Sequence, residues 1–280
     1  MFHRLGNYLA ACNRLEGCRG HCGSGRFSNR RKWMVERDLR ERQDRMSASS
    51  NAGRIGVWGA SGSGKSSYVK KLIKARKRLV IFDPLEEYGP ELRIRSVVHS
   101  ARDSLDQVRQ AMVDDWQGFR VAYVPPSDKE PAALSALCKL LMAAQQPFKD
   151  GKSKAGLTLV VEEMNLSFPV SGGAQKCPGF ANVCSRGRHY GIEVIGVSQR
   201  IAEVATRFRN NCTETVVLRQ KGPRDLDAAA AEIGGDRAAV ARLKNLEYLH
   251  ERHGTVTPGK IIFPKATNSS RKPAAKRKRA

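Results

Sequence analysis

The sequence predicts an α/β fold with a mostly parallel central sheet. Short apolar, β-prone runs alternate along the chain with segments of helical spacing, the pattern of strands joined by crossover helices. One apolar run leads into a glycine-rich loop and then a helix, and another ends in two adjacent acidic residues. Both features are typical of the carboxyl ends of parallel strands, where open α/β sheets bind ligands.

Hydrophobic periodicity places the individual elements. We expect strands at 55–58, 79–82, 94–98, 119–124, 157–161, 192–197 and 213–218. We expect helices at 65–76, 103–115, 130–146, 179–189 and 225–243. The element boundaries are predicted to within a few residues.

The glycine-rich loop lies in the stretch RIGVWGASGSGKSSYVKKL, residues 54–72. Its residues 59–66 fit the pattern G-x-x-x-x-G-K-[ST] between an apolar strand and a helix, as a phosphate-binding loop requires. Glycines let successive amides point into one concavity at a helix N-terminus, where the helix dipole also favours an anion. We therefore expect ATP, with Lys65 at the β and γ phosphates and Ser66 offering a hydroxyl to Mg²⁺. The residues expected to hold the nucleotide are Gly59, Ala60, Ser61, Gly62, Ser63, Gly64, Lys65, Ser66 and Ser67.

The acidic pair follows the apolar run in LTLVVEEMN, residues 157–165. Such a run is typical of a buried parallel strand with carboxylates at its carboxyl end. Glu162 is expected to hold Mg²⁺, and Glu163 to orient and deprotonate the attacking water. Most nucleotide hydrolases of this kind carry aspartate first, so Glu162 departs from the pattern.

Charge indicates a polyanionic partner. The 280-residue chain has a net charge of +23 and a pI near 10.2. Residues 1–50 hold 11 basic against 5 acidic side chains, and residues 265–280 hold 7 basic and no acidic ones. Nucleic acid is the favoured partner. We expect three parts: a basic N-terminal arm and linker at 1–50, an ATPase domain at 51–264, and a basic tail at 265–280, with both extensions flexible.

Other classes of protein fit less well. No run approaches the roughly 18 apolar residues of a membrane span, and LAAC at 9–12 lacks the apolar stretch of a secretion signal. The odd count of seven cysteines indicates free thiols in a reducing compartment. Cys12, Cys18, His21 and Cys22 have no usual zinc spacing, and Met34 and Met46 are alternative start sites.

Three further segments carry a resemblance. LVIFDPLEEYG at 79–89, SRGRHYGIEVIGVSQR at 185–200 and RNNCTETVVLR at 209–219 follow the glycine-rich loop in the order of the FtsK/HerA superfamily of DNA-pumping ATPases. The compact chain is most similar to the genome-packaging ATPases of tailless, membrane-containing icosahedral viruses. The resemblance implies a RecA-like P-loop NTPase core assembled as a ring, commonly a hexamer, around double-stranded DNA. It further implies ATP-driven pumping of DNA into a preformed capsid, with capsid vertex proteins as partners, in the host cytoplasm or the virion.

The same resemblance assigns two further roles. Gln199 matches the sensor at the end of a strand that reports the γ phosphate. Arg186 or Arg188 matches the arginine finger that reaches the neighbouring subunit, and the sequence does not choose between them. Candidate DNA-contacting loops are 146–156, with Lys149, Lys152 and Lys154, and the glycine-rich 171–179.

Several alternatives stay open. The chain resembles filamentous-phage assembly ATPases and conjugative DNA pumps less closely, because those proteins are usually membrane-anchored. A nucleotide-gated nucleic-acid-binding protein with little turnover is another alternative, which Glu162 in place of aspartate favours. A small-molecule kinase is least favoured, since no substrate lid is evident and a metabolite does not require so basic a chain.

Overall fold

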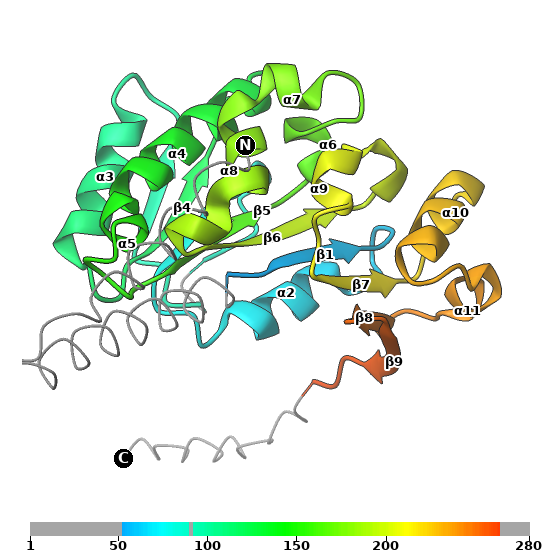
Figure 1. The fold of residues 1–280 in the computed structure, drawn as a ribbon. Coiled ribbons are helices and arrows are strands. Elements are labelled where there is room, and N and C mark those ends of the chain that lie inside the picture. Colours follow the sequence, from blue (N-terminus) through cyan, green and yellow to red (C-terminus); the bar gives the residue numbers. More distant parts are fainter. Residues whose placement is uncertain (1–51, 90–91, 264–280) are drawn as a thin grey trace, which may run out of the picture. The chain divides into compact units, whose positions relative to one another are not determined.

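The computed structural model describes residues 52–89 and 92–263, which lie within one compact unit, Ser47–Ala280 (Figure 1). Its strands are β1 (Arg54–Trp58), β2 (Leu79–Phe82), β3 (Ser96–His99), β4 (Arg120–Val124), β5 (Leu157–Val161), β6 (Ile192–Ser198), β7 (Glu214–Leu218), β8 (Glu247–Arg252) and β9 (Thr255–Lys260). They form one nine-stranded sheet in the order β3-β4-β2-β5-β6-β1-β7-β8-β9. All pairs from β3 to β7 are parallel, and only β7–β8 and β8–β9 are antiparallel. The predicted α/β class with a mostly parallel sheet is confirmed.

Helices connect these strands on both faces of the sheet. The α-helices are α2 (Lys65–Ile73), α3 (Ser104–Asp114), α4 (Glu130–Ala144), α5 (Gln146–Lys149), α6 (Met164–Ser167), α7 (Gly173–Lys176), α8 (Pro178–Arg186), α9 (Thr206–Arg209), α10 (Pro223–Glu232) and α11 (Arg237–Arg242). Short 3₁₀ turns cover Gly187–Tyr190 and Ile201–Glu203. None of the helices in the described ranges is long and apolar enough to cross a membrane.

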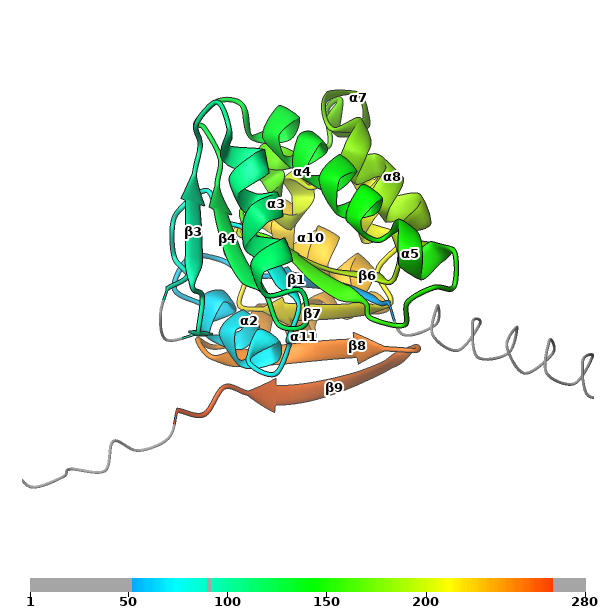
Figure 2. The ribbon, with the colours of Figure 1, turned by 90° about the vertical axis from the view of Figure 1, so that its left-hand side faces the viewer.

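Two apolar layers sandwich the sheet. On one face α2 packs over a smaller cluster, while α3, α4 and α8 lie on the other face over a larger one (Figures 1 and 2). Strand β2 illustrates the alternation: Leu79 and Ile81 belong to the smaller cluster, and Val80 and Phe82 to the larger. Burial on both faces explains why the central strands are continuous apolar runs.

The parallel order brings distant segments to one side of the sheet. We call the side where the parallel strands end the carboxyl edge, and the side where they begin the amino edge. Strand β6 pairs with both β1 and β5. The glycine-rich loop after β1, the acidic pair after β5 and Gln199 after β6 therefore all follow strands that end at the carboxyl edge.

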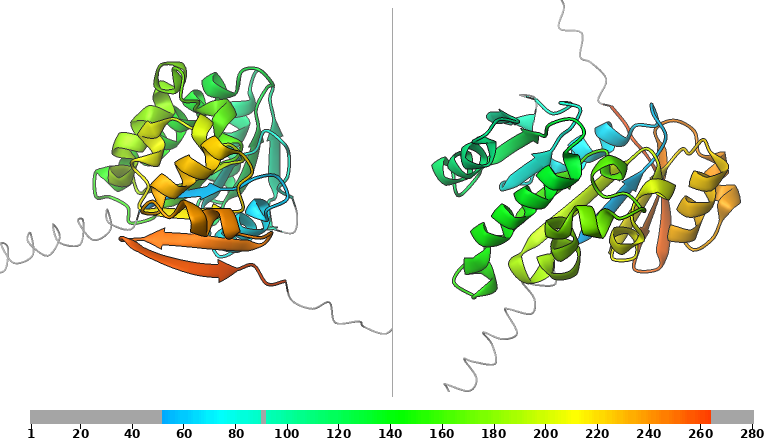
Figure 3. Two further views of the ribbon diagram at one scale, coloured as in Figure 1. Left: turned by 90° about the vertical axis from the view of Figure 1, so that its right-hand side faces the viewer. Right: turned by 90° about the horizontal axis from the view of Figure 1, so that it is seen from above.

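In the C-terminal third, one predicted helix was wrong and one hairpin was missed. The predicted helix at 225–243 is broken into α10 and α11, because Gly234 and Gly235 adopt φ angles of 88° and 94° that no helix accommodates. The β8–β9 hairpin was not predicted. It turns at His253–Gly254, with φ values of 52° and 77°, and lies at the end of the sheet beyond β7 (Figure 3).

Smaller differences affect two segments proposed as loops and one predicted helix. The segment 146–156 contains α5, and 171–179 contains α7 and the start of α8. The predicted helix at 179–189 ends at Arg186 and continues as a 3₁₀ turn. Four cysteines lie in the described part, and all four are free, as expected. The N-terminal cysteines and His21, the alternative start sites and both basic extensions lie outside the described residues.

A close approach between α4 and α8 makes a test of this packing. A methyl group at Gly179 would lie 2.1 Å from the backbone oxygen of Ser135. Gly179→Ala is therefore expected to destabilise the fold by about 1–3 kcal/mol through overpacking, lowering the midpoint of thermal unfolding by several degrees. Gly118→Ala is the control, because its methyl group would make only ordinary contacts with Asp115. Equal midpoints for the two variants would contradict the described packing.

Candidate nucleotide-binding site

The glycine-rich loop forms a cradle between β1 and α2. Gly62 and Gly64 adopt φ angles of 71° and 105°, and α2 begins at Lys65 with no side-chain cap. The φ of Gly64 lies in a region that side chains rarely adopt, and a methyl group there would lie 2.9 Å from a methyl group of Leu246, so this position favours glycine. The first amides of α2 are thus left for an external acceptor at a helix N-terminus, where an anion is favoured.

Lys65 and Ser63 are buried polar residues of this cradle that lack a strong partner within the described part of the chain. Lys65 is only 9% exposed, and its Nζ makes a long contact of 3.5 Å with the backbone oxygen of Ala60. Burial lowers the pKa of Lys65, while the carboxylates of Glu163, Glu162 and Glu87 oppose the shift. The buried Ser63 hydroxyl has no hydrogen-bond partner among the described residues. A buried ammonium and an orphaned hydroxyl beside free helix amides fit a phosphate group.

The acidic pair lies at the same edge, and both members are largely buried. The hydroxyl of Tyr88 donates a hydrogen bond to the carboxylate of Glu162. Burial raises the pKa of Glu162 to about 7, although the hydrogen bond from Tyr88 opposes the shift. Glu163 adopts a left-handed conformation with φ 42°, unusual for glutamate, at the start of α6. Such backbone strain is typical of functional positions.

Gln199 meets Glu163 directly. Its Nε2 donates to Glu163 Oε1 over 2.6 Å, which joins the end of β6 to the end of β5. The structure therefore brings together three residues singled out from sequence: Lys65, Glu163 and Gln199 line one cavity.

A third carboxylate, Glu87, was missed from the sequence. Ser66 donates its hydroxyl to Glu87 Oε2 over 2.8 Å. The segment is held by Asp83, whose two carboxylate oxygens accept the backbone amides of Glu87 and Tyr88, each over 3.1 Å. Asp83 followed by proline is a turn signal that could have indicated this placement.

The chain beyond β7 also contributes. Leu246 lines the cavity, adopts a φ of 70°, and donates its amide to the oxygen of Ser63 over 2.9 Å. Arg219, at the end of β7, donates to the oxygen of Ser61 over 3.2 Å. Both contacts fix the loop from sequence positions more than 150 residues away. No local pattern predicts them.

The resulting cavity has a volume of about 330 Å³. It is lined by Ser61, Gly62, Gly64, Lys65, Ser66, Ser67, Glu87, Glu162, Glu163, Gln199 and Leu246. Gly59 and Ala60 anchor the loop instead, because their amides donate to the oxygens of Ser198 and Arg219 over 3.2 and 2.8 Å.

Metal binding would depend on the nucleotide. The described residues contain no group of three histidine, cysteine or acidic side chains placed to hold a metal ion by themselves. Mg²⁺ is commonly held by one or two protein ligands together with substrate phosphates and water. Ser66 and Glu162 fit that arrangement, with Glu87 beside Ser66.

None of the five basic residues predicted for the arginine finger or for DNA contact, Lys154 included, lines this cavity. Arg186 and Arg188 are exposed and lie just before β6, at the amino edge. Lys149 and Lys152 precede β5 and are exposed as well. Since the cavity opens at the carboxyl edge, a role for either arginine at the γ phosphate would require a second subunit.

No protein-family model matches the chain, and no curated protein matches its sequence. Among solved structures, the genome packaging NTPase from Sulfolobus turreted icosahedral virus 2 in complex with ATP-gammaS is similar at TM-score 0.59 and 17% identity. The match covers 76% of this chain and 98% of that one.

A second similar structure comes from a bacterium. VirB4 of Thermoanaerobacter pseudethanolicus aligns at TM-score 0.54 and 14% identity, covering 76% of this chain and 90% of that one. At these identities the likeness concerns the fold. The fold that the sequence resemblance implies, the α/β core of a P-loop NTPase, is confirmed at this level, and the assignment to the FtsK/HerA superfamily stays a prediction.

Proposed function

We propose that the chain is an ATPase that drives translocation of double-stranded DNA, and that its role is packaging a viral genome into a preformed capsid. One observation carries the proposal: a glycine cradle, Lys65, Glu163 and Gln199 converge on one cavity of about 330 Å³. The likeness in fold to a genome packaging NTPase and to VirB4 supports the ATPase part of this proposal. The packaging role places the protein in the host cytoplasm or the virion.

In this proposal each residue has a task. The amides of the loop and Lys65 would bind the phosphates, and Ser66 and Glu162 would hold Mg²⁺, whose charge would offset that of the β and γ phosphates. Glu163 accepts a proton from the attacking water, and Gln199, bonded to Glu163 over 2.6 Å, holds that carboxylate in place. Burial of Lys65 and both glutamates excludes bulk water, which strengthens these electrostatic contacts.

The chain needs partner subunits in this proposal. Arg186 or Arg188 acts as an arginine finger in the neighbouring subunit's cavity, where such a residue accelerates phosphoryl transfer by roughly 10³–10⁵. Both arginines are exposed at the amino edge, so they are accessible to a neighbour. A closed ring, commonly a hexamer, satisfies this head-to-tail arrangement.

The experiment is steady-state ATP hydrolysis with and without linear double-stranded DNA, at low and physiological salt. We expect turnover that DNA stimulates, more strongly at low salt because phosphate contacts weaken as salt rises. Tight ATP binding without turnover under any condition would favour the alternative of a nucleotide-gated DNA-binding protein. That alternative rests on the glutamate at position 162, where most nucleotide hydrolases of this kind carry aspartate.

Glu87 provides a test of the metal site. Glu87→Gln keeps an acceptor for Ser66 but removes one negative charge, so the Mg²⁺ concentration that half-saturates turnover is expected to rise by about tenfold or more. The measurement is an Mg²⁺ titration of ATP hydrolysis. Glu86→Gln is the matched control, because Glu86 is exposed and pairs with His99 over 3.0 Å. An unchanged Mg²⁺ dependence in Glu87→Gln would remove Glu87 from the site.

A further inference from the structure

A second, larger cavity lies at the amino edge of the sheet, whereas the nucleotide site lies at the carboxyl edge. It has a volume of about 620 Å³, and we call it the Arg78 cavity. Its walls come from the segments that precede β1, β2, β4, β5 and β6. The charged residues that line it are Arg76, Lys77, Arg78, Lys154 and Glu193.

Arg78 is the unusual member of this group. It is only 6% exposed, and its guanidinium lies 4.3 Å from the ring of Trp116. Its hydrogen-bond acceptors are all uncharged: the side-chain oxygen of Gln145 at 3.1 Å and the backbone oxygens of Ala155 and Gly156. Its Nε is buried and has no hydrogen-bond partner in the part of the chain that the structure describes. Within the described residues no carboxylate pairs with this buried cation.

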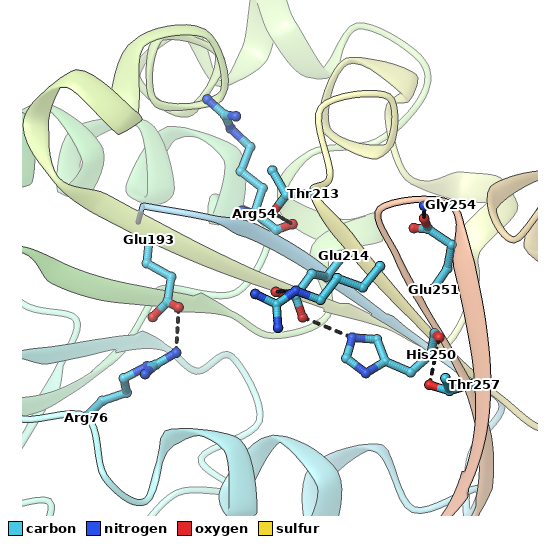
Figure 4. Close-up of polar contacts among 10 residues, drawn as sticks. Arg54, Arg76, Glu193, Thr213, Glu214, His250, Glu251, Gly254 and Thr257 are labelled. Carbon is cyan, nitrogen blue, oxygen red and sulfur yellow. Dashed lines mark hydrogen bonds and ion pairs between the residues drawn. The ribbon is translucent and has the colours of Figure 1, made fainter. Parts of the chain in front are cut away.

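The one acidic residue of the cavity does not compensate that charge. Glu193 accepts from Arg76 over 2.6 Å and from the hydroxyl of Thr158 over 2.6 Å, so both its oxygens are engaged (Figure 4 shows the Arg76 pair). Lys77 is exposed at the rim, with no ion pair in the described part of the chain. The cavity therefore keeps an excess of positive charge, and a buried charge without a counter-ion is costly.

We propose that the Arg78 cavity binds phosphate groups of the DNA backbone, an inference that rests on the proposed DNA translocase. A phosphate oxygen at the rim would supply the anion that Arg78 and Lys77 lack. The contact reads charge and not base sequence, which suits a protein that must pass any DNA. It also places DNA contact at the edge that carries the exposed lysines of 146–156.

The first test is a lysine footprint on the wild-type protein. Acetylation rates of individual lysines are measured by mass spectrometry without ligand, with linear double-stranded DNA, and with ATP as the other phosphate source. We expect DNA to slow acetylation of Lys77 and Lys154, ATP to slow that of Lys65, and neither to affect Lys129, which is exposed after β4 at the carboxyl edge. Protection of Lys77 by ATP alone, or no protection of Lys77, would overturn the inference.

The second test is charge reversal at the rim, which leaves the buried Arg78 in place. Lys77→Glu is expected to weaken DNA binding about fivefold to tenfold near 0.1 M salt and to reduce the salt dependence by about one phosphate contact. Lys129→Glu makes the same change in net charge and is expected to have little effect. Equal losses in the two variants would overturn the site.

The two proposals fail separately. DNA-stimulated ATP turnover with no protection of Lys77 would overturn only the Arg78 cavity. Protection of Lys77 without any ATP turnover would support the cavity and contradict the translocase.

Discussion

Lys65→Ala is expected to abolish measurable ATP turnover. The turnover number should fall by at least about 10²–10³-fold, which is the effect of removing one preorganised hydrogen-bond donor from a site where negative charge develops. Lys65 is buried, and it is the only basic side chain among the described residues that line the cavity, so no neighbour there replaces its charge. ATP affinity is expected to fall as well, because in the proposed mechanism the lysine already contacts the phosphates of bound ATP before the reaction.

The control for this variant is Lys71→Ala, an exposed lysine on the same helix. Turnover at the wild-type level is expected there. A Lys65→Ala protein that folds normally and hydrolyses ATP at the wild-type rate would show that the glycine-rich loop is not the reaction site.

Glu163→Gln is expected to lower the turnover number by about 10²–10⁴-fold while ATP binding is retained. The substitution keeps the size of the side chain but removes the carboxylate that is proposed to accept a proton from water. Its partner Gln199 donates over 2.6 Å, and a glutamine at 163 offers an oxygen for the same hydrogen bond. Binding and turnover should therefore separate, measured as nucleotide affinity beside steady-state hydrolysis.

Glu130→Gln, a change of the same kind at the exposed end of α4, serves as the control and should behave as wild type. Equal loss of ATP binding and turnover in Glu163→Gln would contradict a role for Glu163 in the chemical step.

The parts of the fold that local sequence determines were predicted well. Strands β1, β2 and β5 are short apolar runs buried on both faces, and their burial depends on composition more than on partners. The loop between β1 and α2 was equally clear, because phosphate binding at a helix N-terminus needs glycines and lysine at fixed positions.

Other parts depend on contacts that no local pattern carries. The β8–β9 hairpin is polar and largely exposed, so its strands lack an apolar signature. Glu87 reaches Ser66 only because the Asp83 carboxylate fixes the intervening turn. Leu246 reaches the loop from the far end of the domain. The split of α10 from α11 was predictable in principle, since Gly234–Gly235 is a strong break signal inside an otherwise helical pattern.

The most direct test of the account is displacement of a third DNA strand from a triplex built on linear duplex DNA. A translocating protein must strip the third strand as it moves, whereas a static DNA-binding protein leaves it in place. We predict ATP-dependent displacement by the wild-type protein and none by Glu163→Gln. ATP hydrolysis that DNA stimulates, without any displacement of the third strand, would contradict translocation.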